Sequence, residues 1–127
     1  MNRQIKALAQ LQKLAQLRSD LEMRSFSVFR AHVAAAQARL GMLEDDLQQL
    51  YHVTDAFTIA GARLTNALTT DKVHEIRREE ALLRQMQPRF ESARQKAMRE
   101  FGRAQVLQQM HDDLVRDARQ IDQRKQQ

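Results

Sequence analysis

The sequence contains no cysteine, which excludes disulfide bonds and cysteine-ligated metals. It also has no tryptophan, one tyrosine, one proline and three glycines. Aromatic residues make up only 5% of the chain, too few for a thick, many-layered core. No apolar run approaches the roughly 18 residues that a membrane-spanning helix needs. Sustained alternation of apolar and polar residues is also missing, so strands are not expected.

The residues that are abundant favour helices. Alanine, glutamine, leucine and arginine dominate, and all four are good helix formers. A length of 127 residues fits one domain spanning 1–127. Charged residues make up 29% of the chain, which suits a thin, elongated core in which each helix buries one stripe. The sequence therefore predicts an all-α fold.

Apolar residues recur at alternating spacings of three and four, the heptad pattern of a coiled coil. The first series is Phe26, Phe29, Val33, Ala36, Leu40, Leu43, Leu47, Leu50, Thr54, Phe57, Gly61, Leu64 and Leu68. The second series is Ile76, Glu79, Leu83, Met86, Phe90, Ala93, Ala97, Glu100, Ala104, Leu107, His111, Leu114, Ala118 and Ile121. The two series are out of phase, because continuing the first would put Asp71 and Glu75 in the core. We therefore expect the chain to fold back on itself.

The fold-back is expected about Thr70. If the numbers of facing residues sum to 140, the first series as far as Leu64 lies opposite the second, and Leu47 faces Ala93. A polar cluster at the centre, Thr69 to Asp71, can then cap the second helix by accepting hydrogen bonds from its first N–H groups.

These patterns predict a long antiparallel two-helix coiled-coil hairpin. The first helix is expected over about 2–67, the turn over about 68–71 and the second helix over about 72–124. Gly61 and several β-branched residues weaken helix propensity in residues 52–68. An alternative is therefore that the first helix ends near Tyr51, leaving a longer connection. Pro88 is expected to kink the second helix, or to divide a short helix over about 72–86 from a longer one.

The same pairing leaves residues 1–14 with nothing opposite them, although they carry an apolar stripe with basic flanks. Each large side chain left in water forgoes roughly 1.5–3 kcal/mol of burial. We expect either self-association or another protein with an acidic rim to cover the stripe, unless it wraps onto the C-terminal tail or frays. The candidate partner-binding residues are Arg3, Ile5, Lys6, Leu8, Leu11, Lys13, Leu14 and Arg18.

No pattern in the sequence points to catalysis. The set closest to a metal site is His111-Asp112-Asp113, but adjacent residues on a helix point in different directions. A glycine-rich phosphate loop, a nucleophile elbow and an HExxH motif are all missing. We therefore expect no catalytic residue, no cofactor and no metal, and the chain is not expected to be an enzyme.

The net charge of +5 is unevenly distributed. Residues 1–40 carry seven basic and two acidic residues, 41–75 carry two and six, and 76–105 carry eight and four. Such blocks can steer an acidic protein or a nucleic acid. A nucleic-acid-binding adaptor is therefore one alternative, although aromatic stacking platforms are few. A basic membrane-surface helix at 1–19 and a self-associating structural coiled coil are two others.

Three features resemble the FliJ/YscO family of stalk proteins from flagellar and type III secretion systems. They are the doubled heptads and the segments "IKALAQLQKLAQLRSDLE" and "RREEALLRQMQPRFESARQKAMREF". The resemblance covers nearly the whole chain and is architectural.

That resemblance implies a cytoplasmic protein in the central pore of a hexameric export ATPase, held at the inner membrane through the export apparatus. It also implies contacts with the export gate and with substrate chaperones. The tip that carries both chain ends would enter the ATPase ring, and the arginine-rich second helix would contact chaperones or the gate.

Overall fold

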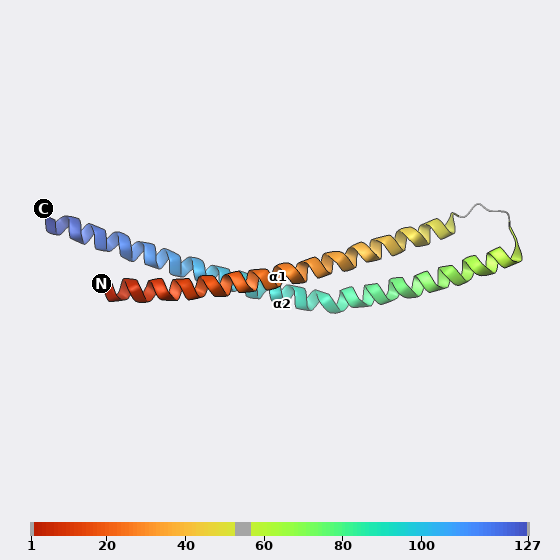
Figure 1. Cartoon of the computed structure of the whole chain (residues 1–127), viewed down its shortest axis with the longest axis horizontal. Helices are drawn as coiled ribbons and strands as arrows, with labels where there is room; N and C mark the ends of the chain where they lie inside the picture. The colour runs from red at the N-terminus through yellow and green to blue at the C-terminus, as the bar shows by residue number, and fades with distance from the viewer. Residues whose placement is uncertain (1, 53–56, 127) are drawn as a thin grey trace. The chain divides into compact units, whose positions relative to one another are not determined.

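The computed structural model describes residues 2–52 and 57–126. Two helices account for nearly all of this part of the chain, α1 (Asn2–Tyr51) and α2 (Ile59–Gln126), and it contains no strand (Figure 1). The predicted all-α fold is confirmed.

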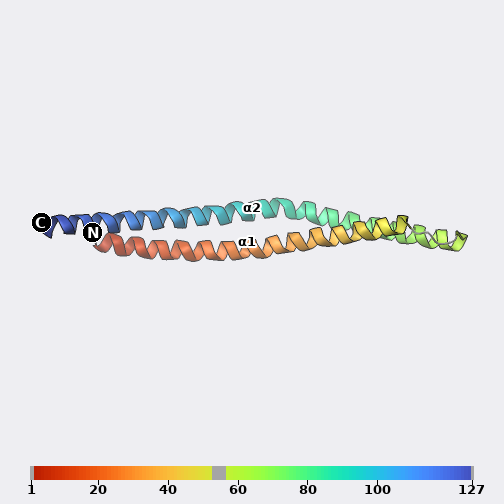
Figure 2. The same ribbon diagram turned by 90° about the horizontal axis from the view of Figure 1, so that it is seen from above.

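Two compact units can be distinguished along these helices. Unit 1 combines Met1–Ser27 with Glu91–Gln127, and unit 2 is Val28–Phe90. Each unit therefore contains one stretch of α1 and one stretch of α2. The two stretches run side by side within each unit, as Figure 1 and Figure 2 both show.

In unit 2 the two stretches are antiparallel. The Arg39 Nε atom lies 3.3 Å from Glu79 Oε1, and the Lys72 Nζ atom lies 3.5 Å from Asp46 Oδ2. A step forward along α1, from Arg39 to Asp46, is thus a step backward along α2. In unit 1 the pairing has the same sense, because Glu22 pairs with Lys96 while Leu11 and Leu107 line one groove further along.

In each unit the side chains along which α1 and α2 contact each other form a buried row, which we call the seam. The seams follow the predicted heptads closely. Every member of the second series from Ile76 to Ala118 is buried or half-buried, and so is every member of the first series from Phe26 to Leu50. Three alanines, Ala36, Ala97 and Ala104, are at most 2% exposed. Small residues at these positions allow the two helix backbones to approach closely.

The position of the turn differs from the prediction. The first helix ends at Tyr51, which confirms the alternative with a longer connection, and α2 has already begun at Ile59. The expected turn over 68–71 is therefore wrong. Thr69 and Thr70 lie inside α2, where their hydroxyls donate hydrogen bonds of 2.8 and 2.9 Å to carbonyls four residues earlier. These bonds let a polar cluster persist within a helix.

The residue that caps α2 is Thr58. Its Oγ1 atom accepts a 2.9 Å hydrogen bond from the Gly61 N–H, and its carbonyl accepts one of 2.9 Å from Ala62. A Cβ atom added at Gly61 would lie 2.8 Å from Thr58 Oγ1, so glycine leaves room for the cap. The helix therefore begins with an N-cap threonine that uses its hydroxyl as an acceptor.

The early start of α2 changes which residues face each other. Phe29 and Phe90 stack with ring centroids 6.4 Å apart, and facing residue numbers sum to 118 or 119 rather than 140. Leu47 follows Asp46, the partner of Lys72, so the expected pairing of Leu47 with Ala93 is wrong. Because a heptad pattern repeats every seven residues, sums of 119 and 140 align it equally well.

Two other expectations concern the end of the first series and the effect of Pro88. Phe57, Leu64 and Leu68 are 84%, 61% and 44% exposed, so the first series leaves the core after Leu50, while its member Thr54 lies outside the described residues. Pro88 does not divide the second helix, because α2 is continuous through it. A kink at Pro88 stays a prediction.

Candidate functional site

The N-terminal part of α1 is paired with α2. Leu8 is only 6% exposed and Ile5 is half-buried. The expectation that residues 1–14 have nothing opposite them is therefore wrong. The error follows from the turn, because ending α1 at Tyr51 brings the last third of α2 alongside these residues. The seam also continues in the same heptad phase from Phe26 back through Glu22 and Ser19, which are not apolar and were therefore not predicted.

Because the seam passes through other residues, several leucines of α1 remain outside it. Their exposed fractions are 54% for Leu11, 51% for Leu14, 61% for Leu17 and 63% for Leu21. On α2, Val106 is 59% exposed. Unit 1 thus carries a second apolar surface in addition to its buried seam.

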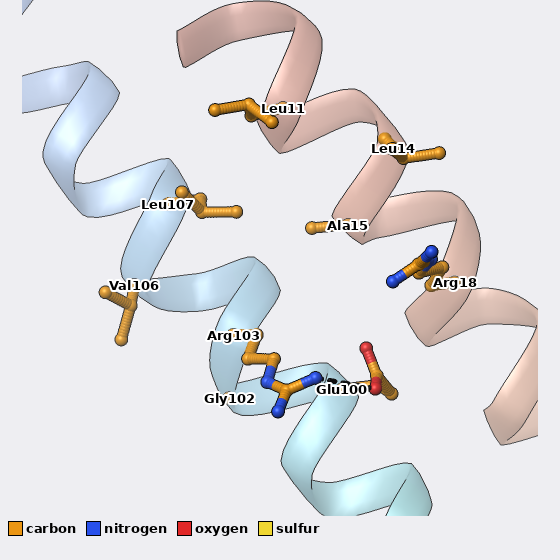
Figure 3. A pocket seen from close by; sticks show the side chains of 9 residues that line it. All are labelled: Leu11, Leu14, Ala15, Arg18, Glu100, Gly102, Arg103, Val106 and Leu107. Atoms are coloured by element: carbon orange, nitrogen blue, oxygen red, sulfur yellow. Dashed lines mark hydrogen bonds and ion pairs between the residues drawn. The ribbon is translucent and has the colours of Figure 1, made fainter.

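Part of this surface forms a groove of about 470 Å³, which we call the terminal groove. Its lining residues are Leu11, Leu14, Ala15, Arg18, Glu100, Gly102, Arg103, Val106 and Leu107. In Figure 3, Ala15 and Leu107 point toward one another between the two helices, while Arg18 and Arg103 lie at the same end of the view as Glu100. Apolar side chains thus form most of the lining, and arginines border one end.

The charges at the groove leave a positive excess. The Arg103 Nη1 atom lies 3.1 Å from Glu100 Oε1, which satisfies both groups, and the Glu100 side chain is only 15% exposed. Arg18 is exposed and makes no ion pair or hydrogen bond to any residue that the structure describes. A carboxylate brought to the groove would therefore find an unpaired guanidinium, the best side-chain match for bidentate carboxylate binding.

The eight predicted partner-binding residues divide into three groups. Three of them, Leu11, Leu14 and Arg18, line the terminal groove together. Ile5 and Leu8 belong to the seam, where Leu8 is buried and Ile5 is half-buried. The basic residues Arg3, Lys6 and Lys13 are exposed and do not line the groove.

The α2 half of the groove was not predicted. Val106 and Leu107 are adjacent apolar residues, and only Leu107 belongs to the heptad series. Val106 could therefore have indicated a second apolar row beside the seam. Which residues of α1 share a groove with Val106 depends on the register, which the heptad pattern alone leaves undetermined.

Two further features were sought among the described residues, a metal-binding group and a membrane-spanning helix. No group of three His, Asp or Glu side chains within 2–52 and 57–126 is placed to hold a metal ion. In the same ranges, neither helix has a stretch apolar enough to cross a membrane. Comparison with known proteins found no matching family model, no matching curated protein and no matching solved structure.

Proposed function

We propose that this chain is a non-enzymatic coiled-coil interaction protein that uses the terminal groove to bind a protein partner. The observation that carries the proposal is the groove itself, where Leu11 and Leu14 are half-exposed beside an unpaired Arg18. Burying each of these leucines against a partner would contribute roughly 1.5–3 kcal/mol. A charge-assisted hydrogen bond to Arg18 would fix the orientation of that partner. The favoured partner therefore presents an apolar ridge with an acidic edge.

The biological setting that we propose is a flagellar or type III export ATPase complex, with this chain as its stalk or chaperone-escort component. The support is the sequence resemblance to the FliJ/YscO family and the compatible presence of two long helices. In that setting the partners are the hexameric ATPase, the export gate and substrate chaperones. The proposal also implies a cytoplasmic chain held at the inner membrane through the export apparatus.

Co-purification of the full chain with the export ATPase from the same organism tests this setting. The wild-type chain is expected to bind, and the double variant Leu11→Asp/Leu14→Asp is expected to lose binding, because two carboxylates replace apolar contacts. Val106→Asp tests the α2 side of the groove. The matched control is Leu17→Asp/Leu21→Asp, which changes two leucines that are at least as exposed but do not line the groove.

The outcomes separate the groove from the biological setting. If the wild-type chain fails to bind the ATPase, the export role is rejected. If binding survives all three groove substitutions, the contact lies elsewhere. Circular dichroism of each variant checks that the helices remain intact.

Self-association is the second candidate, because the same exposed leucines favour it. A two-fold contact through this groove would leave Arg18 of each copy without an acidic partner unless it reached a carboxylate of the other copy, so charge complementarity does not favour it. Sedimentation at several concentrations decides between the two. A dimer that Leu11→Asp/Leu14→Asp dissociates would show that a second copy of the chain occupies the groove.

A further inference from the structure

Unit 2 contains a separate groove, which we call the acidic groove. It has a volume of about 590 Å³ and is lined by Asp46, Gln49 and Leu50 from α1 and by Leu68, Asp71, Lys72 and Glu75 from α2. Three of these seven side chains are carboxylates and one is an amine. None of them belongs to the terminal groove or to the proposed function.

A further heptad row, exposed except at the half-buried Glu75, runs along α2 into this groove. Its members are Gly61, Leu64, Leu68, Asp71 and Glu75, spaced alternately by three and four. Leu64, Leu68, Asp71 and Glu75 each precede a buried or half-buried residue by one position, so they lie about 100° around the helix from the seam. Leu64 is 61% exposed and Leu68 is 44% exposed, so α1 does not cover them. This spacing is the one that a further helix needs for knobs-into-holes packing.

The apolar end of the row continues into a neighbouring hollow. Leu64 lines that hollow together with Tyr51 and Phe57, which are 62% and 84% exposed. An apolar patch of this kind, bordered by charged residues, is typical of a protein-binding surface.

Two carboxylates at the charged end of the row are not engaged in ion pairs with described residues. Lys72 is engaged by Asp46 at 3.5 Å. Asp71 and Glu75 make no ion pair with any residue that the structure describes. In sequence, 41–75 carries six acidic residues against two basic ones. The acidic groove therefore presents a negative field next to exposed leucines.

We propose that the acidic groove binds a basic amphipathic helix of another protein. Its apolar residues would pack on Leu64 and Leu68, and its lysines or arginines would pair with Asp71 and Glu75. Charge complementarity selects this occupant, because two acidic grooves meeting in a symmetric dimer would bring unpaired carboxylates together. The proposal is independent of the terminal groove and of the export role.

A designed peptide tests the proposal with the full-length chain. The probe is a fluorescein-labelled helix of about three heptads, with leucine at the a and d positions and lysine on both flanks. The reference probe replaces every lysine with glutamate. We expect fluorescence anisotropy to detect binding of the lysine peptide and none of the glutamate peptide.

Variants then locate the contact. Asp71→Asn/Glu75→Gln is expected to weaken binding of the lysine peptide about fivefold, the effect of losing two partly screened ion pairs. The control Asp117→Asn/Asp122→Asn removes the same charge from exposed positions in unit 1 and is expected to leave binding unchanged. Leu64→Asp/Leu68→Asp should abolish binding while helicity is retained, because both leucines are already exposed.

Three results would overturn the proposal. The first is equal affinity for the lysine and glutamate peptides. The second is an equal loss in Asp71→Asn/Glu75→Gln and in the unit 1 control, which would indicate nonspecific attraction. The third is concentration-dependent sedimentation of the free chain that Leu64→Asp/Leu68→Asp removes, which would make a second copy the occupant.

Discussion

Ser19 is a buried polar residue within the seam of unit 1. It is 1% exposed, and its Oγ atom has no hydrogen-bond partner among the described residues. A buried hydroxyl without a partner destabilises the folded state, because it has lost its bonds to water without replacing them. The sequence suggested no role for this residue, since a serine breaks the apolar pattern that marks a core.

The variant Ser19→Ala is therefore expected to stabilise the protein. Alanine removes the unsatisfied hydroxyl and also has the higher helix propensity. Ser25→Ala is the matched control, because Ser25 is an exposed position of the same helix and gains only the propensity. We expect the free energy of unfolding of Ser19→Ala to exceed that of the control by about 1 kcal/mol in urea denaturation. Equal values would show that the Ser19 hydroxyl is satisfied in solution.

Glu91 and Arg94 form an exposed ion pair one turn apart on α2. The Arg94 Nη2 atom lies 2.6 Å from Glu91 Oε1, and Nε lies 3.1 Å from Oε2. These hydrogen bonds, and the positive charge of Arg94, lower the pKa of the Glu91 carboxyl below its ordinary value. A lowered carboxyl pKa adds stability above the ordinary pKa, and this stability is lost as the pH falls through the lowered one.

Arg94→Gln is expected to return the pKa of Glu91 upward, toward its ordinary value. The measurement is an NMR titration of the Glu91 side-chain carboxyl carbon in both proteins. Arg99→Gln removes an equal charge from an exposed position on the same helix and should leave the Glu91 pKa lowered. An unchanged titration in Arg94→Gln would mean that the pair does not form in solution.

At the scale of the helices, the sequence predicted the composition of the seams better than their alignment. The second series is buried or half-buried as predicted through Ala118, because its heptad spacing continues without a break even where Glu79, Glu100 and His111 replace apolar residues. The position of the turn was missed because Thr69 and Thr70 bond to their own helix, whereas the true cap, Thr58, lies in a weakly helical segment. Of the residues that line the terminal groove, only Leu11, Leu14 and Arg18 were among the predicted residues, since the α2 residues depend on the alignment.

Disulfide trapping tests the alignment directly, since the chain has no native cysteine. Arg39→Cys/Glu79→Cys is expected to crosslink faster under mild oxidation than a displaced pair, because the native side chains meet, with Arg39 Nε 3.3 Å from Glu79 Oε1. Arg39→Cys/Met86→Cys is the control, in which the second cysteine is two helical turns, about 10 Å, further along α2. Rapid crosslinking in the control but not in the first variant would contradict the alignment described above. The extent of crosslinking is read from gel mobility without reductant.

At the scale of the whole molecule, fewer free cations are available than the 21 lysine and arginine residues suggest. Several arginines of α2 are engaged by acids three residues earlier, as in Arg94–Glu91, Arg103–Glu100 and Arg116–Asp113. Such pairing lowers the number of cations that can neutralise phosphates. The composition therefore favours a protein partner over a nucleic acid.

Binding to DNA is accordingly expected to be weak and to disappear as salt rises. Fluorescence anisotropy with labelled single- and double-stranded oligonucleotides between about 50 and 200 mM salt measures it. Tight binding with an affinity that falls steeply as salt rises would instead support the nucleic-acid-binding alternative, whereas an affinity that does not fall with salt would exclude it. An unrelated protein of similar size and similar positive net charge serves as the comparison for general electrostatic attraction.

The seven-residue periodicity of the paired helices has an evolutionary consequence. Deleting residues 37–43 together with 76–82 would remove one repeat from each helix of unit 2, and every remaining pair would keep its partner. Deleting either segment alone would misalign all pairs beyond it. Homologous chains are therefore expected to differ in length by steps of about fourteen residues, divided equally between the helices. Natural selection could shorten or lengthen such a protein by this route and leave its binding surfaces unchanged.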